Sequence, residues 1–359
     1  MRIAVVLGTR PEIIKLSPVI RELVNKKVDF FIVHTGQHYS YNMDKVFFEQ
    51  LRLPKPKYNL EIGSGSHAQQ TAKIMLNIEK VFIEENPDII LVQGDTNTVL
   101  AAALTATKLH IKVGHIEAGL RSYDQQMPEE VNRILTDHCS NYLFAPTEKA
   151  RAILLSEGVL HNTVFVTGNT IVDAVHQNLE ISNRNADTIR SLKLVPKGYF
   201  LATIHRQENV DDFYKFSSVL IALQKLTTIY HLPVIYPIHP RSRKMIDEFK
   251  LNYKDLNLIE PVNFLGFLQL EKNARLILTD SGGVQEESCI LGVPCVTIRE
   301  NTERPETIDV GANILAGTLP QKILECSEIM LRKYHPWPNP FGDGKAGEKI
   351  VAKLIGGNE

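Results

Sequence analysis

Residues 88–119, DIILVQGDTNTVLAAALTATKLHIKVGHIEAG, and residues 274–300, ARLILTDSGGVQEESCILGVPCVTIRE, carry the strongest fold signal in this chain. Each stretch has a short apolar run, a polar turn, a helix-length segment and a second apolar run. Strand, turn, helix and strand in that order are typical of a parallel sheet covered by helices. Because the pattern occurs in both halves of the 359-residue chain, we predict an α/β protein of two doubly wound, Rossmann-like units.

The same alternation continues outward from these two stretches. Apolar runs predict strands in the first half at Arg2–Leu7, Phe30–Thr35, Ile89–Gln93, Val113–Glu117, Tyr142–Ala145 and Val164–Val166. They predict strands in the second half at Phe200–Thr203, Val234–Pro237, Leu256–Ile259, Leu276–Thr279 and Cys295–Ile298. Helices are expected between the strands, notably at Pro11–Asn25, Ala68–Glu85 and Thr98–Leu109.

We place the boundary between the units near Gly168–Asn169, which gives an N-terminal domain of residues 1–168 and a C-terminal domain of residues 169–340. A proline-rich run before residue 341 suits a segment that crosses back, so residues 341–359 should form a last helix on the first domain. Ligands of open α/β sheets bind beyond the carboxyl ends of the strands. If the halves stack edge to edge, both polar turns should face one cleft.

Composition excludes several classes of function. The 40 basic and 41 acidic residues give a net charge of −1, which argues against nucleic-acid and anionic membrane partners. The N-terminal apolar run is too short to span a bilayer and lacks a cleavage site, so we expect a cytoplasmic protein. The four cysteines form no CxxC pair, and no GxGxxG or Walker motif is present, so we expect neither a metal nor a cofactor.

The run DSGGVQEES, residues 280–288, is a candidate phosphate site. A strand followed by Ser281, Gly282 and Gly283 and then a helix aims backbone N–H groups outward, where an anion can bind. One of the two following carboxylates, Glu286 or Glu287, could accept hydrogen bonds from a sugar or ribose. The alternative is an ordinary strand-to-helix junction that binds nothing.

Charged residues also follow the first strand. Arg10 and Lys15 lie at the start of the helix that Pro11 begins, and both could hold a diphosphate at the carboxyl end of that strand. Alternatively, both are solvated charges at a helix start.

Acidic residues follow two further strands of the first half. Asp95 and Glu117 come after apolar runs that should be neighbours, which would bring their carboxylates within about 5–10 Å of each other. Glu129 and Glu130 add an acidic pair at a helix start. In the alternative interpretation, Asp95 caps the helix near Thr98, and the pair only complements the positive helix N-terminus.

In the second half, His205 and Arg206 come just after a strand, where an imidazole can donate to a phosphate or transfer a proton. A satisfied loop histidine is the alternative, and the same choice applies to His239. The run TERPE, residues 302–306, offers Arg304 or its two carboxylates to a sugar or nucleotide.

Together these residues resemble the non-hydrolysing UDP-N-acetylglucosamine 2-epimerase family. The matching motifs occur in the family's order and span essentially the whole chain: GTRPEIIKLSP, QGDTNTVLAAAL, GHIEAGLRS, PEEVNRILTDH, TGNTIVDA, HRQEN, LTDSGGVQEE, TERPE and NPFGDG. The resemblance implies a fold of the glycosyltransferase B type, with a nucleotide cleft between two domains. It also implies interconversion of UDP-N-acetylglucosamine and UDP-N-acetylmannosamine by elimination of UDP to 2-acetamidoglucal and its re-addition.

The resemblance also assigns roles to residues. It implies an acid/base group of Asp95, Glu117 and Glu129, with His205, Arg10 and Lys15 at the diphosphate. Arg206 is included among the substrate-binding residues. It implies that Ser281, Gly282 and Gly283 hold phosphate, that Glu287 binds the ribose hydroxyls and that Arg304 binds the sugar or phosphate. It also implies that the uracil lies against Phe267 and that the main chain at Val262 contacts the edge of the uracil. We expect a UDP-sugar substrate and a homodimer.

Two features depart from the family pattern. Gln37 and His38 match a pair involved in activation by a second UDP-sugar, but the residues after them do not, so activation stays open. The same segment looks like the branch acting on UDP-2,3-diacetamido-2,3-dideoxyglucuronic acid, whereas TERPE favours UDP-N-acetylglucosamine. Three further functions are compatible with these residues: a glycosyltransferase of the same fold, a hydrolysing epimerase and a UDP-sugar sensor without turnover.

Overall fold

The computed structural model describes residues 1–36, 41–185, 187–332 and 336–356. The chain forms two compact units, Met1–Gln177 with Phe341–Glu359, and Asn178–Pro340. The division lies inside helix α7 (Thr170–Asn185), later than the Gly168–Asn169 boundary expected from the sequence. Gln37 and His38 lie outside the described residues.

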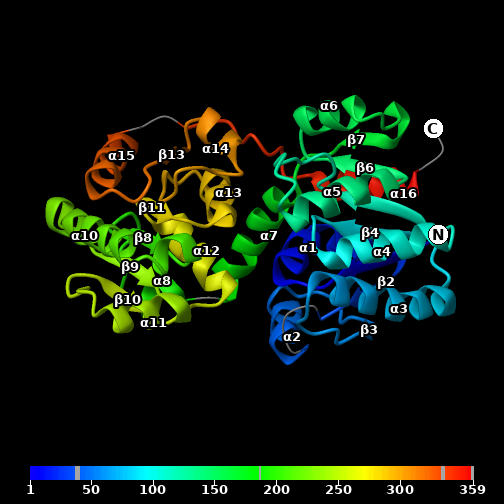
Figure 1. Cartoon of the computed structure of the whole chain (residues 1–359), viewed down its shortest axis with the longest axis horizontal. Helices are drawn as coiled ribbons and strands as arrows, with labels where there is room; N and C mark the ends of the chain where they lie inside the picture. The colour runs from blue at the N-terminus through cyan, green and yellow to red at the C-terminus, as the bar shows by residue number, and fades with distance from the viewer. Residues whose placement is uncertain (37–40, 186, 333–335, 357–359) are drawn as a thin grey trace. The chain divides into compact units, whose positions relative to one another are not determined.

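Within the described residues, the sheet of the first unit has seven parallel strands (Figure 1). In spatial order they are β3 (Tyr58–Asn59), β2 (Asp29–His34), β1 (Arg2–Leu7), β4 (Ile89–Gln93), β5 (Lys112–Ile116), β6 (Tyr142–Ala145) and β7 (Val164–Val166). The helical segments of this unit are α1 (Arg10–Asn25), α2 (Tyr41–Gln50), α3 (His67–Glu85), α4 (Asn97–Lys108), α5 (Pro128–Cys139), α6 (Glu148–Ser156), η1 (His161–Thr163), the first half of α7, and α16 (Ala346–Ile355).

The sheet of the second unit has six parallel strands in the part of the chain that the structure describes. Their order is β10 (Asn257–Ile259), β9 (Val234–Pro237), β8 (Phe200–Thr203), β11 (Leu276–Thr279), β12 (Cys295–Thr297) and β13 (Asn313–Leu315). The helices are α8 (Thr188–Ser191), α9 (Gln207–Val210), α10 (Phe213–Tyr230), α11 (Pro240–Phe249), α12 (Phe264–Asn273), α13 (Gly282–Leu291), α14 (Pro305–Asp309) and α15 (Pro320–Arg332).

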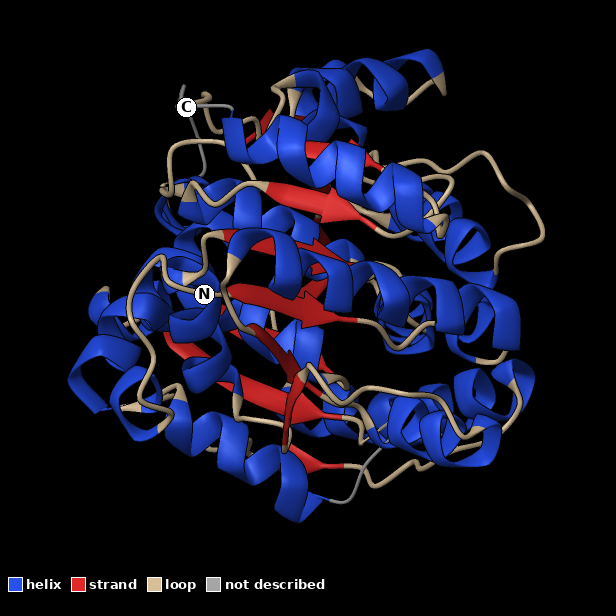
Figure 2. Cartoon of the chain, turned by 90° about the vertical axis from the view of Figure 1, so that its left-hand side faces the viewer, coloured by secondary structure: helices blue, strands red, loops and turns tan. Residues whose placement is uncertain are grey.

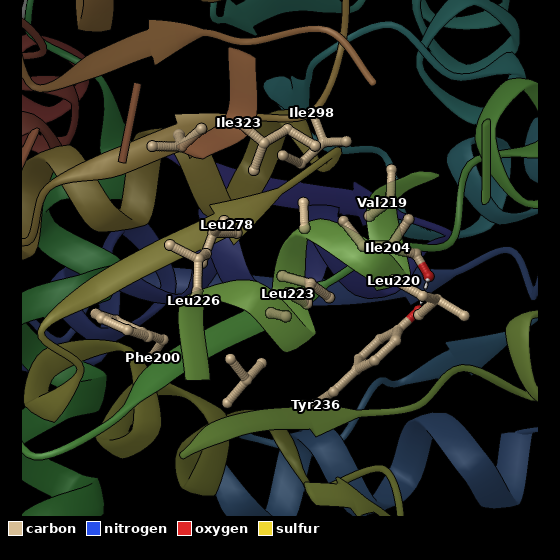
Figure 3. Close-up of a cluster of buried hydrophobic side chains, with 14 of the residues drawn as sticks. Phe200, Ile204, Val219, Leu220, Leu223, Leu226, Tyr236, Leu278, Ile298 and Ile323 are labelled. Atoms are coloured by element: carbon tan, nitrogen blue, oxygen red, sulfur yellow. Dashed lines mark hydrogen bonds between the residues drawn. The ribbon is translucent and has the colours of Figure 1, made fainter. Parts of the chain in front are cut away.

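Central strands of both sheets are mainly apolar, because helices cover both of their faces, and their polar residues lie mostly at the strand ends. Figure 2 shows the strands, in red, lying between helices, in blue. In the second unit α10 packs against α15, and their side chains Leu223 and Ile323 meet Phe200 and Leu278 of the sheet in one buried cluster (Figure 3). The position of each strand end, and therefore of the loop that follows it, is set by this packing.

The buried phenol of Tyr236 links this core to the loop after β8, which carries His205. Its hydroxyl donates to the carbonyl oxygen of Ile204 at 2.5 Å (Figure 3). The Ser242 hydroxyl donates to the same carbonyl at 2.6 Å. Because Ile204 directly precedes His205, these hydrogen bonds from β9 and α11 fix the main chain next to the candidate histidine.

The last helix returns to the first unit, as the sequence indicated. Helix α16 packs on α1, and a Cβ at Gly347 would lie 3.0 Å from the carbonyl carbon of Pro18, so only glycine permits this approach. Buried Asp173 of α7 accepts hydrogen bonds from the first two N–H groups of α16, at Ala346 (3.2 Å) and Gly347 (2.9 Å). None of the described helices is long and apolar enough to cross a membrane.

Candidate functional site

Each sheet has a point at which the direction of strand order reverses, and ligands of open α/β sheets bind beyond the carboxyl ends of the strands there. In the first unit that point lies between β1 and β4, so it is flanked by the turns at Arg10 and Asp95. In the second unit it lies between β8 and β11, so it is flanked by His205 and Ser281. The two switch points therefore carry residues that the sequence had selected as chemical candidates.

Glu12 ties the two turns of the first switch point together. Its buried carboxylate accepts hydrogen bonds from Gly8 N (2.6 Å), Thr9 N (2.8 Å) and Thr96 Oγ1 (2.6 Å). Burial raises the pKa of Glu12, and these hydrogen bonds oppose the rise. The sequence interpretation gave Glu12 no role, although Thr9-x-x-Glu12 is a capping-box pattern that could have revealed it.

Glu117 sits at the end of β5 with its backbone in the left-handed region, at φ +70°. Its carboxylate lies 2.7 Å from Lys15 Nζ, and it accepts a hydrogen bond from Gln93 Nε2 at 2.5 Å. A Cβ at Gly94 would be 3.9 Å from Glu117 Oε2, so this carboxylate lies beside the turn that carries Asp95. A strained non-glycine backbone held by several contacts is typical of functional sites.

Asp95 does not cap the following helix. That alternative is wrong because Thr96 is the N-cap of α4, and its hydroxyl accepts from Val99 N at 3.4 Å. The Asp95 carboxylate instead pairs with Arg133 Nη2 at 2.5 Å, and the Asn132 amide donates to the Asp95 carbonyl at 2.8 Å. Helix α5 thus positions Asp95 through two side chains of the run PEEVNR.

Glu129 and Glu130, adjacent in α5, have different surroundings. Glu130 is buried and accepts from Ser122 N, Tyr123 N and Arg133 Nη1 at 2.9, 2.9 and 2.7 Å. Although burial raises the pKa of Glu130, these bonds bring it below its ordinary value. Glu130 therefore holds the loop before α5, and half-buried Glu129 remains the acid/base candidate of the pair.

A buried charge network behind this site was missed from the sequence. His115 of β5 contacts Asp137 Oδ1 at 2.7 Å through Nδ1 and the Gly94 carbonyl at 2.8 Å through Nε2. Both partners are acceptors, so both ring nitrogens carry protons and the imidazole is a cation. Burial lowers the pKa of His115, but the Asp137 charge and hydrogen bonds raise it above its ordinary value. Arg121, 2.8 Å from Asp137, completes the network that fixes the Gly94 turn.

Arg10 begins α1 at the first switch point. Its guanidinium carbon lies 5.1 Å from the centroid of the Phe47 ring, within the range of a cation–π contact. Lys15, which the sequence assigned to the same diphosphate, lies one turn further along the helix against Glu117.

In the second unit, Asp280 joins the ends of β8 and β11. Its fully buried carboxylate accepts from Arg206 N (2.9 Å), His205 N (3.0 Å) and Asn209 Nδ2 (3.1 Å), and it lies 3.0 Å from His205 Nδ1. Burial raises the pKa of Asp280, but the contacts with His205 and these donors bring it below its ordinary value. Because Nδ1 of His205 donates to Asp280, Nε2 is the nitrogen presented for other chemistry.

The helix start at residues 281–283 has the geometry of an anion site. Ser281 is the N-cap of α13, yet its side chain makes no capping hydrogen bond. A Cβ at Gly282 or Gly283 would meet nothing nearer than 3.9 Å, and neither residue has a positive φ. No contact nearer than 3.9 Å among the described residues requires glycine here, so there is room above the first N–H groups of α13, where helix N-termini can bind anions.

The contacts after β12 distinguish the candidate carboxylates of this unit. Arg304 Nε lies 2.7 Å from Glu286 Oε1, so Glu286 is engaged in an ion pair. Glu303 is held by Arg299 through two hydrogen bonds of 2.8 Å each. Glu287, the next residue of α13, is the carboxylate that the family resemblance assigns to the ribose hydroxyls.

Val262 lies in the loop just before α12, the helix that follows edge strand β10, and Phe267 lies in the first turns of that helix. Both residues are half-buried. The Phe267 amide donates to the Asn263 carbonyl at 2.9 Å, so the ring is carried by a formed helical turn.

The Arg299–Glu303 pair predicts an acid-sensitive contribution to stability. The Arg299 hydrogen bonds lower the pKa of Glu303 to about 2 from 4.5. The stabilisation is therefore fully present above about pH 4.5 and is lost as the pH falls toward 2. We expect Glu303→Gln to flatten the decline in thermal midpoint between pH 5.5 and 3.5, measured by circular dichroism. Exposed Glu260→Gln is the control, and identical slopes for all three proteins would contradict the prediction.

Comparison with known proteins agrees with this architecture. The sequence model of the UDP-N-acetylglucosamine 2-epimerase family matches residues 21–355. The UDP-N-acetylglucosamine 2-epimerase of Methanocaldococcus jannaschii is 56% identical over 365 residues, covering 99% of this chain and 100% of that protein. A UDP-2,3-diacetamido-2,3-dideoxy-D-glucuronate 2-epimerase of Pseudomonas aeruginosa is 40% identical over 358 residues, covering 99% of each chain.

Among solved structures, the M. jannaschii UDP-GlcNAc 2-epimerase in complex with UDP-GlcNAc and UDP superimposes with a TM-score of 0.88 at 57% identity, covering 99% of this chain and 100% of that chain. Two parallel sheets with alternating helices and charged switch points define an α/β protein of the glycosyltransferase B type. Within that class, the chain belongs to the UDP-N-acetylglucosamine 2-epimerase family.

Proposed function

We propose that this protein interconverts UDP-N-acetylglucosamine and UDP-N-acetylmannosamine without net hydrolysis. The observation that carries the proposal is the carboxylate pair at the first switch point, Glu117 beside the turn of Asp95, in a member of this family. Inversion at C-2 without a redox cofactor requires removal of a proton from one face and its return to the other. More than one carboxylate near one sugar carbon suits that task.

The proposed chemistry has two halves. A carboxylate among Asp95, Glu117 and Glu129 takes the C-2 proton, the electron pair of that C–H bond forms the C-1=C-2 double bond, and the C-1–oxygen bond breaks. UDP leaves with the bonding pair, and the sugar becomes 2-acetamidoglucal. In the return step a proton adds to the other face of C-2, and a β-phosphate oxygen of UDP attacks C-1. No oxidant, reductant or water is consumed.

We assign the binding of UDP to the second unit and to the cations of the first. The N–H groups of Gly282 and Gly283 and the hydroxyl of Ser281 offer donors to phosphate, since the Ser281 N–H already donates to Thr279 Oγ1 at 3.0 Å. In its imidazolium form, His205 keeps Nδ1–H on Asp280 and offers Nε2–H as a further donor for charge that develops on the leaving group. We assign the diphosphate to Arg10, Lys15 and Arg206, and the sugar or phosphate to Arg304. We assign the ribose hydroxyls to Glu287. The uracil face is assigned to the ring of Phe267, and the uracil edge to the main chain of Val262.

A second substrate calls for a direct test because the P. aeruginosa relative named for UDP-2,3-diacetamido-2,3-dideoxy-D-glucuronate is 40% identical. Its C-5 carboxylate and C-3 acetamido group would need partners that UDP-N-acetylglucosamine does not. The homodimer and the cytoplasmic location stay predictions from the sequence.

Incubation in deuterium oxide tests the proposal. With UDP-N-acetylglucosamine we expect deuterium at C-2 of both UDP-sugars and an equilibrium mixture of the two, followed by NMR and mass spectrometry. A hydrolysing epimerase would instead end in free N-acetylmannosamine and UDP. A glycosyltransferase or a sensor would leave C-2 without deuterium, and exchange only in the diacetamido sugar would assign the second substrate.

A further inference from the structure

A buried carboxyl group of the second unit has no role in the mechanism proposed above. Glu271, near the end of α12, is 0% exposed, and neither of its oxygens accepts a hydrogen bond from a donor among the described residues. Removing a carboxylate from water without donors or a cation costs several kcal/mol, so such a group is neutral in a folded protein.

The group that faces Glu271 is another carboxyl group. Helix α12 packs on α13, and the Glu271 side chain is in hydrogen-bonding contact with Glu287 of α13. Two carboxylates share a hydrogen bond only when one of them carries a proton. Glu271 is the more deeply buried of the two, at 0% against 9% exposure, so the proton resides on Glu271. Burial first, and then the charge and hydrogen bond of Glu287, raise the pKa of Glu271 well above its ordinary value.

The other polar groups around Glu271 do not neutralise it. The adjacent Lys272 donates to the Leu291 carbonyl at 3.0 Å, and Lys197 donates to the carbonyls of Lys272 (2.9 Å) and Ala274 (2.8 Å). Tyr199 donates its hydroxyl to the Leu270 carbonyl at 2.6 Å. Cys295 of β12 lies within electrostatic range as a buried thiol, with its pKa raised to about 12 by burial.

We propose that Glu271 is a positioning residue, a protonated carboxyl group that donates a hydrogen bond to Glu287 and orients it for the 2′- and 3′-hydroxyls of a UDP ribose. This inference rests on the ribose role of Glu287 in the proposed function. One Glu287 oxygen accepts the hydrogen bond from the protonated Glu271, and the carboxylate also accepts hydrogen bonds from the diol. To accept hydrogen bonds from both hydroxyls of a diol, the Glu287 carboxylate must keep one orientation. The hydrogen bond from buried Glu271 holds it in that orientation.

A matched pair of variants isolates the hydrogen bond. Glu271→Gln keeps a donor to Glu287 in a side chain of the same shape, whereas Glu271→Met fills the volume without a donor. Isothermal titration with UDP and with 2′,3′-dideoxy-UDP gives a ratio of affinities that measures recognition of the diol. In the wild type we expect this ratio to be on the order of 10–100, because hydrogen bonds to a charged group contribute about 1.5–3 kcal/mol each.

We expect Glu271→Gln to keep the ratio within about threefold of wild type and Glu271→Met to reduce it toward one, as Glu287→Ala should. The Met variant should nevertheless fold, since it replaces a fully buried carboxyl group whose oxygens have no donor among the described residues, and Glu287 keeps 9% exposure to water. Equal ratios in the Met and Gln variants overturn the proposal, and so does a wild-type ratio near one. UDP binding requires no turnover, so a failure of epimerisation alone would show in the deuterium experiment and leave these ratios interpretable.

Discussion

Replacement of Glu117 by Gln should lower kcat for epimerisation by about 10²- to 10⁴-fold, the usual contribution of a general acid or base. The carboxamide keeps the shape of the side chain and an oxygen for Gln93 Nε2, but it cannot carry the C-2 proton. UDP affinity should stay within a few-fold of wild type, because the proposed contacts to UDP do not involve Glu117. Steady-state kinetics and the rate of deuterium uptake at C-2 measure the effect.

Asp95→Asn should give a loss of the same order, since Asp95 stands at the neighbouring strand end. Glu79→Gln, on the exposed face of α3, is the matched control and should retain wild-type kcat. If the Asp95 and Glu117 variants both kept wild-type activity and wild-type ligand affinity, the assignment of these carboxylates to proton transfer would be wrong.

Gly283→Ala should change stability and ligand affinity in opposite directions. A methyl group here meets no described protein atom nearer than 3.9 Å, and φ is not positive, so the folded protein should gain about 0.4–1 kcal/mol. UDP affinity should fall roughly 10-fold or more, because one extra methyl in a closely fitted site costs about 1–3 kcal/mol. Urea denaturation and calorimetric titration with UDP give the two quantities.

Gly292→Ala, at the other end of α13, is the mirrored control. Gly292 caps the helix at φ +70°, so a side chain there should cost about 1 kcal/mol of stability without changing UDP affinity. An unchanged UDP affinity in Gly283→Ala would show that the space above the first turn of α13 is not used by phosphate.

Much of the secondary structure follows from the sequence because its signals are local. The strands expected in the two halves are all present, with ends shifted by at most one residue, as in β2 (Asp29–His34 against the predicted Phe30–Thr35). The edge strands β3 and β13 were missed. β3 has only two residues, too few to show a period. β13 is as long as the predicted strand β7, but one of its three residues is the polar Asn313, which leaves an apolar pair instead of an apolar run. The short helices α9 and α14 were missed because they, like β3, are too short to show a period.

The candidate site was partly predictable. Residues at strand ends stand out when parallel strands alternate with helices, which is why Asp95, Glu117 and His205 were selected. The alternative in which Asp95 caps the helix could not be excluded from the sequence, because Asp and Thr are both good N-caps and only backbone geometry identifies Thr96 as the cap. The two switch points require the strand order, which no local pattern contains.

Alternating apolar runs and the order of motifs such as GTRPE and TDSGG were sufficient to establish the fold class and the family resemblance, because both depend on short-range spacing along the chain. Pairings between distant residues required the folded chain: Lys15 with Glu117, His115 with Asp137, His205 with Asp280, and Glu271 with Glu287. The protonation state of each group depends on burial and on those distant partners. The tertiary structure therefore decides the role of each acid: Glu117 is a candidate for chemistry, Glu130 holds a loop, and Glu271 is the acid that we propose to be neutral.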